Sequence, residues 1–181
     1  MIRLAAHGQA VGVEGWLIGR LVRDPVQTES RRDCVLVCDD PARPPGDLSG
    51  YRAVLSERGH DAATPCPRVH SISTTDHLRD GHIVMLTSRG RVLTLYRPES
   101  EHNAIFATDR CNNNCLMCSQ PPIDRRDDEK VEQNLEVVRL ICPPPAALGL
   151  TGGEPTLLGE GLFRILRSVR DRLPTTRLHV L

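Results

Sequence analysis

Three cysteines lie close together in the chain, with three residues between the first two and two between the second and third: Cys111, Cys115 and Cys118. Thiolate sulfur is the usual ligand of iron–sulfur clusters, and four cysteines normally complete a four-iron cluster. Three cysteines would bind three irons and leave the fourth iron open, and an open coordination position marks a reactive site rather than a structural one. The spacing therefore predicts a loop whose cluster can bind a further ligand.

A second motif reads Gly152-Gly153-Glu154-Pro155 and follows the short apolar segment 147–151. The two glycines let the backbone approach a ligand closely because neither has a Cβ atom. The Glu154 carboxylate can bind a cationic amino group, and Pro155 fixes the turn into the next segment. An ordinary strand-to-helix turn could have the same residues. The place of the motif at the carboxyl end of a predicted strand favours a ligand site.

In this order, the two motifs resemble those of the radical S-adenosylmethionine (SAM) superfamily. The resemblance implies a [4Fe–4S] cluster on Cys111, Cys115 and Cys118, and a SAM molecule whose amino group is held by the Gly-Gly-Glu-Pro segment. It also implies an enzyme that uses an external electron donor to cleave SAM reductively to a 5′-deoxyadenosyl radical. Met117 stands where the family usually has an aromatic residue against the adenine. The implied cofactor-binding residues are Met117, Gly152, Gly153, Glu154 and Pro155.

The segment 108–122 is most similar to one subgroup, the radical SAM maturases of the His-Xaa-Ser peptide-modification system. This narrower resemblance implies a small ribosomally made peptide as substrate and a sister radical SAM maturase as partner. Residues 1–100 would then be a candidate peptide-docking module. Addition of a peptide strand to an exposed sheet edge is one physical way to dock it.

Other interpretations of the cysteines remain open. A zinc site would need a fourth ligand, for which Cys142 or His102 could serve. The three cysteines could also be buried structural residues, because free cysteine packs as a small hydrophobic side chain. Cys34 and Cys38 are four residues apart on a predicted strand and could form a second metal site. At the level of function, the alternatives are an iron–sulfur or zinc-binding module without SAM chemistry, and an inactive truncated remnant.

The composition limits which partners and which cellular compartment we expect. The 181 residues carry 23 basic and 23 acidic side chains, so the formal net charge of zero gives no reason to expect nucleic acid or an anionic membrane as partner. No run is long and apolar enough to span a bilayer, and the N-terminus lacks the features of a signal peptide. We therefore expect a cytoplasmic protein, in which clustered cysteines bind metal rather than form disulfides.

The predicted fold class is α/β: a small β-rich N-terminal region, residues 1–100, followed by the first βα units of a radical SAM partial (β/α)6 barrel, residues 101–181. The second region alternates strands and helices, and its three strands are too few for such a barrel, so we expect a truncated chain. The charged residues 124–132 are expected to be a solvated helix start. Predicted strands are 15–22, 34–38, 82–86, 91–96, 103–108, 147–151 and 177–181, and predicted helices are 127–141 and 160–173.

Overall fold

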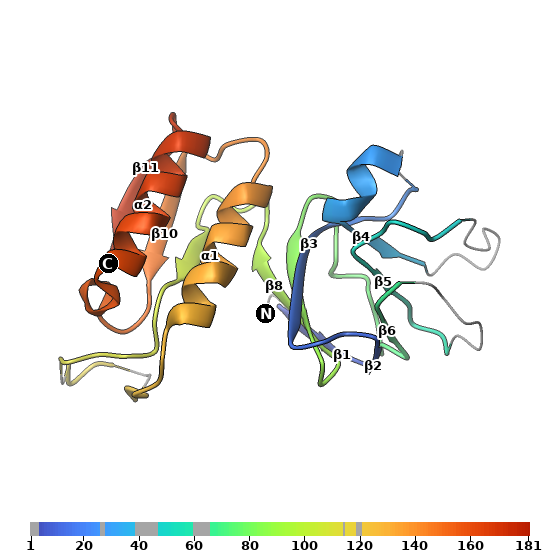
Figure 1. Cartoon of the computed structure of the whole chain (residues 1–181), viewed down its shortest axis with the longest axis horizontal. Coiled ribbons are helices and arrows are strands. Elements are labelled where there is room, and N and C mark those ends of the chain that lie inside the picture. The colour runs from blue at the N-terminus through green and yellow to red at the C-terminus, as the bar shows by residue number, and fades with distance from the viewer. Residues whose placement is uncertain (1–3, 26–27, 39–46, 60–65, 114, 119–120) are drawn as a thin grey trace. The chain divides into compact units, whose positions relative to one another are not determined.

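A computed structural model describes residues 4–25, 28–38, 47–59, 66–113, 115–118 and 121–181. The chain divides into two compact units, Met1–Arg97 and Pro98–Leu181 (Figure 1). Within the described ranges, the longest apolar helical stretches fall short of what a membrane span requires.

The first unit is built on one eight-stranded mixed sheet, whose strands follow the order β1-β8-β7-β3-β4-β5-β6-β2. The pairs β3–β4, β4–β5 and β5–β6 are parallel, and the other four pairs in this order are antiparallel. The elements are β1 (Ala5–His7), β2 (Gln9–Val11), β3 (Trp16–Val22), the 3-10 helix η1 (Thr28–Asp33), β4 (Cys34–Val37), β5 (Ala53–Leu55), β6 (Arg68–His70), β7 (Ile83–Thr87) and β8 (Arg91–Tyr96).

The two ends of this sheet are consecutive segments of one stretch of chain, since only Gly8 separates β1 from β2 (Figure 1). A Cβ atom at Gly8 would overlap the backbone oxygen of His70, and the Gly8 amide donates to the Gly90 oxygen at 2.9 Å. The bend at Gly8 thus joins the first strand of the order to the last. Each edge strand contains three residues, so this sheet offers little edge for strand addition.

Strand β4 shows how the two faces of the sheet are used. Val35 and Val37 belong to a large apolar cluster together with Leu55 of β5. Cys34 and Leu36 point to the other face, because side chains alternate along a strand. There they join a smaller cluster that also contains Leu48, Tyr51, Val54 and Cys66.

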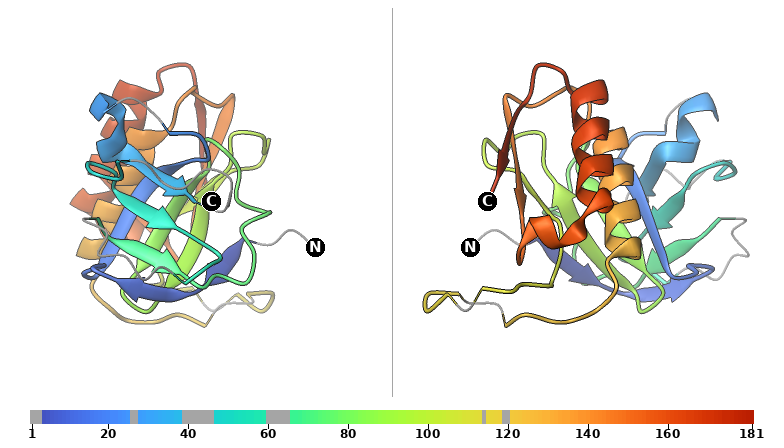
Figure 2. Two further views of the ribbon diagram at one scale, coloured as in Figure 1. Left: turned by 90° about the vertical axis from the view of Figure 1, so that its right-hand side faces the viewer. Right: turned by 60° about the vertical axis from the view of Figure 1, so that its left-hand side comes forward.

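The second unit is a three-stranded parallel sheet in the order β11-β10-β9 with two α-helices that pack side by side (Figure 2). Gly161 allows the helices to approach closely, because a Cβ atom there would lie 2.8 Å from a methyl group of Val131. The elements are β9 (Ala104–Phe106), α1 (Asp128–Leu140), β10 (Ala147–Thr151), the 3-10 helix η2 (Pro155–Leu158), α2 (Glu160–Arg172) and β11 (Arg177–Val180).

The predicted fold class, a small β-rich region followed by the first units of a radical SAM partial (β/α)6 barrel, is wrong. The described residues form an eight-stranded mixed sheet, a separate three-stranded parallel sheet and two α-helices. Alternating strands and helices occur both in barrels and in open parallel sheets, so the alternation could not distinguish them. The individual helices are confirmed: the predicted helices 127–141 and 160–173 correspond to α1 and α2.

Candidate functional site

The backbone segments that leave β9 and β10 run beside each other beyond the sheet. The two strands are parallel neighbours, with Phe106 opposite Thr151. Past the strand ends, the Gly153 amide donates to the Thr108 oxygen and the Glu154 amide to the Arg110 oxygen, both at 2.8 Å. This pairing brings the start of the cysteine loop next to the Gly-Gly-Glu-Pro motif, at the edge where ligands of parallel sheets bind.

The two glycines of the motif are required by this close approach. Gly152 has a φ of +141°, and a Cβ atom there would lie 2.5 Å from the Thr108 oxygen. A Cβ atom at Gly153 would overlap the Arg110 oxygen and would lie 3.1 Å from Cβ of Cys111. Any larger residue would push the motif away from the first cysteine.

The Glu154 carboxylate is held by three donors. Oε1 accepts from the Thr156 hydroxyl at 2.7 Å and from the Thr156 amide at 3.1 Å, and Oε2 accepts from Nδ2 of Asn113 at 3.2 Å. These hydrogen bonds, led by that of the Thr156 hydroxyl, lower the pKa of Glu154 below its usual value. The carboxylate is therefore ionised at neutral pH and suited to bind a cationic amino group.

A cavity of about 410 Å³ brings most of the predicted site residues together. Two predicted residues do not line it. The Met117 side chain is 94% exposed, and Pro155 is buried at the start of η2. The predicted residues that line the cavity are Cys111, Cys115, Cys118, Gly152, Gly153 and Glu154.

The three cysteines of the loop are reduced, and Cys115 and Cys118 are exposed. The Asn113 amide donates to the sulfur of Cys111 at 3.4 Å, and the Cys118 amide donates to the Cys115 oxygen at 3.0 Å. Among the described residues, no three histidine, cysteine or acidic side chains converge closely enough to hold a single metal ion. In a four-iron cluster each thiolate binds its own iron, so the sulfurs need not converge on one point.

The residues present fit the cluster and SAM by two observations. The three cysteines and Glu154 line one cavity, and the glycine pair lets the Glu154 segment lie within hydrogen-bonding distance of the residues just before Cys111. The expected fourth zinc ligands, Cys142 and His102, do not line the cavity.

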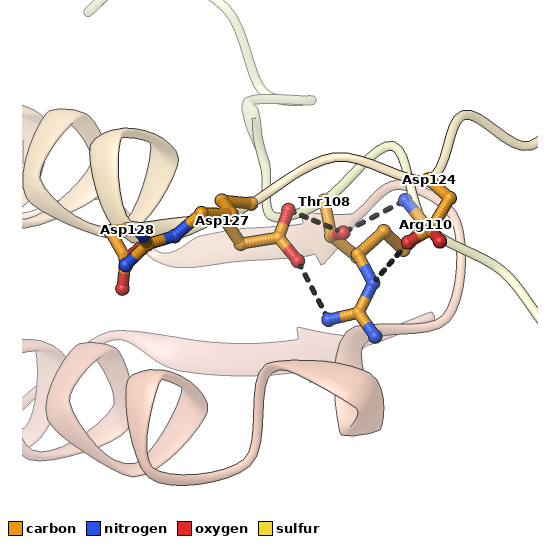
Figure 3. Close-up of polar contacts among 6 residues, drawn as sticks. Thr108, Arg110, Asp124, Asp127 and Asp128 are labelled. Atoms are coloured by element: carbon orange, nitrogen blue, oxygen red, sulfur yellow. Dashed lines mark hydrogen bonds and ion pairs between the residues drawn. The ribbon is translucent and has the colours of Figure 1, made fainter.

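A polar network beside the loop was not predicted from the sequence (Figure 3). Asp127 accepts a hydrogen bond from the Thr108 hydroxyl at 2.8 Å and lies 3.5 Å from Nη1 of Arg110. The Thr108 hydroxyl oxygen in turn accepts from the Arg110 amide at 2.9 Å. Asp124, which is 99% exposed, lies 3.4 Å from Nε of Arg110. The prediction of a solvated helix start is therefore wrong for Asp127, whose side chain is only 10% exposed.

Comparisons with protein-family models, with curated proteins and with solved structures find no match to this chain.

Proposed function

We propose that this chain is a radical SAM iron–sulfur enzyme that cleaves SAM reductively. One observation carries the proposal. The thiols of Cys111, Cys115 and Cys118 and the Glu154 carboxylate line the same cavity, although a helix and a strand separate them along the chain. The resemblance of both motifs to the superfamily supplies the chemistry that this arrangement would serve.

Each part of the site has a role in this proposal. The three thiolates would hold a [4Fe–4S] cluster, and the ionised Glu154 would bind the amino group of SAM. When bound, the cluster and SAM would supply a 5′-deoxyadenosyl radical for hydrogen abstraction. The chain would orient the cofactor and exclude water, for which Phe106 and Ile123 provide apolar lining.

The proposed substrate is a small ribosomally made peptide, modified together with a sister radical SAM maturase. The similarity of residues 108–122 to the His-Xaa-Ser maturases supports this assignment. An external electron donor completes the system. The first unit is the proposed docking module, and its short edge strands favour recognition by side chains over strand addition. The cytoplasm is the proposed location, because a reducing compartment keeps thiols available as ligands.

Anaerobic reconstitution with iron and sulfide, followed by incubation with SAM and a reductant, tests the proposal. We expect four irons per chain by analogy with the cluster type, and formation of 5′-deoxyadenosine detected by chromatography. A Cys115→Ala variant should form no 5′-deoxyadenosine, whereas a Cys34→Ala variant should form as much as the natural chain. Zinc bound in place of iron, or a cluster that leaves SAM intact, would contradict the proposal.

A further inference from the structure

Asp127 occupies the N-cap position of α1 but makes no capping hydrogen bond with its side chain. An aspartate at this position normally accepts from the first backbone amides of its own helix. Here the carboxylate is directed to the segment that leaves β9, where it contacts Thr108 and Arg110 (Figure 3). A partly buried carboxylate that bonds to a distant segment instead of its own helix holds the two segments together.

The segment that Asp127 holds is the one that supports both halves of the proposed cofactor site. Thr108 is fully buried and its backbone oxygen accepts from the Gly153 amide, while the Arg110 oxygen accepts from the Glu154 amide. Arg110 is also the residue immediately before Cys111. Asp127 therefore holds this backbone segment in two ways, by its hydrogen bond with Thr108 and by its ion pair with Arg110. The segment in turn connects Cys111 to Glu154.

We propose that Asp127 is a positioning residue that sets the place of Cys111 relative to Glu154. This inference rests on the proposed function, in which Cys111 would help to hold the cluster and Glu154 would bind the amino group of SAM. Asp127 touches neither and acts only through Thr108 and Arg110. Supporting residues of this kind typically change ligand affinity by about 10- to 100-fold when they are replaced.

The chain contains a matched control for Asp127. Asp124 pairs with the same Arg110 guanidinium, at 3.4 Å, but it is 99% exposed, and the Thr108 hydroxyl donates to Asp127 instead. Exposed ion pairs contribute little because solvent and salt screen them. Asp127→Asn and Asp124→Asn remove the same charge from the two partners of one arginine, so they separate the effect of position from the effect of charge.

Hydrogen exchange on the cluster-free protein tests the inference without any cofactor. Asp127→Asn should accelerate exchange of the Gly153 and Glu154 amides by about tenfold, because their acceptor segment is less firmly held. Asp124→Asn should leave both rates unchanged. Unchanged exchange rates in Asp127→Asn would overturn the inference. Faster exchange throughout the second unit would also overturn it, because Asp127 would then stabilise the whole unit and not this segment in particular.

Titration of the reconstituted protein with SAM, followed by electron paramagnetic resonance (EPR), supplies the second readout. Asp127→Asn should keep the iron content and the SAM-free spectrum but need about 10- to 100-fold more SAM for the same spectral change. Thr108→Val should reproduce this defect, and Thr108→Ser, which retains the hydroxyl, should restore binding. If the natural chain binds no SAM, the proposed function fails; if it binds SAM and Asp127→Asn binds equally well, only the positioning role fails.

Discussion

The cysteines of the two units differ in environment, although the residue type is the same. In the first unit, Cys34 and Cys66 are 5% and 9% exposed, and burial raises the pKa of both thiols. In the second unit, Cys115 and Cys118 are exposed on a loop that lines a cavity. A cysteine packed on a strand serves as a small apolar side chain, whereas one on an open loop is available as a ligand. Exposure therefore separates Cys115 and Cys118 from Cys34 and Cys66.

Removal of single thiols should give the largest difference between the two groups. Cys111→Ala, Cys115→Ala or Cys118→Ala should each abolish cluster assembly, because the cluster has no spare protein ligand. Cys34→Ala should assemble the cluster fully and cost only the stability of a lost buried side chain. Iron and sulfide content after anaerobic reconstitution measures the effect, and a cluster retained in the Cys118→Ala protein would refute this division.

The second-largest difference should be the rate at which the cysteines are alkylated in the native, cluster-free protein. Cys115 and Cys118 should react about 100-fold or more faster than Cys34 and Cys66 at neutral pH. The buried thiols need local opening to meet the reagent, and their raised pKa lowers the thiolate fraction at any given pH. Mass spectrometry of the modified chain over time follows each site. Equal rates would show that burial in the first unit does not protect Cys34 and Cys66.

A glycine substitution should reveal how closely the Gly-Gly-Glu-Pro segment packs against the segment that precedes Cys111. Gly153→Ala should destabilise the second unit by about 1–3 kcal/mol, because its Cβ atom would overlap the Arg110 oxygen. Gly59→Ala in the first unit is the control, since a Cβ atom there meets nothing within 4 Å. Its effect should stay within about 0.5 kcal/mol. Urea denaturation measures both, and equal stabilities would contradict the close approach of the two segments.

The smallest expected effect is a change in the pKa of Glu154, which is lowered, whereas the thiol pKa values of Cys34 and Cys66 in the first unit are raised. Hydrogen bonds lower the pKa of Glu154, so its contribution to stability is present above the pKa of the unfolded chain and is lost as pH falls through the folded value. Thr156→Val removes the leading hydrogen bond and should raise this pKa toward its usual value. Asn113→Ala should raise it less, because Asn113 contributes the smallest share. Carbon-13 NMR of the carboxylate during a pH titration reports both variants.

Local sequence patterns predicted the segments of the second unit well. The helix pattern with an acidic first turn corresponds to α1, in which Asp128 and Glu129 complement the helix dipole. The two motifs also meet at one cavity, because parallel strands bring their carboxyl ends to one edge. Met117 and Pro155 were the exceptions among the predicted cofactor-binding residues, since Met117 is exposed to solvent and Pro155 is buried at the start of η2.

The arrangement of the strands could not be derived in the same way. The joining of β1 and β2 across the first unit depends on Gly8, which is an unremarkable residue in the sequence. Pairing between distant strands depends on register and closure, which periodicity within a segment does not encode. The role of Asp127 was likewise hidden, because an aspartate before a helix predicts a local cap and not a contact with Thr108.

EPR of the reduced, reconstituted protein with and without SAM tests the proposed function most directly. A four-iron signal that changes when SAM is added is the predicted result, because it requires an open iron next to the Glu154 carboxylate. The same spectrum in a Glu154→Ala protein should change only at much higher SAM concentrations. A cluster signal that SAM leaves unaltered in the natural chain would contradict a cofactor site between the cysteine loop and the Gly-Gly-Glu-Pro motif.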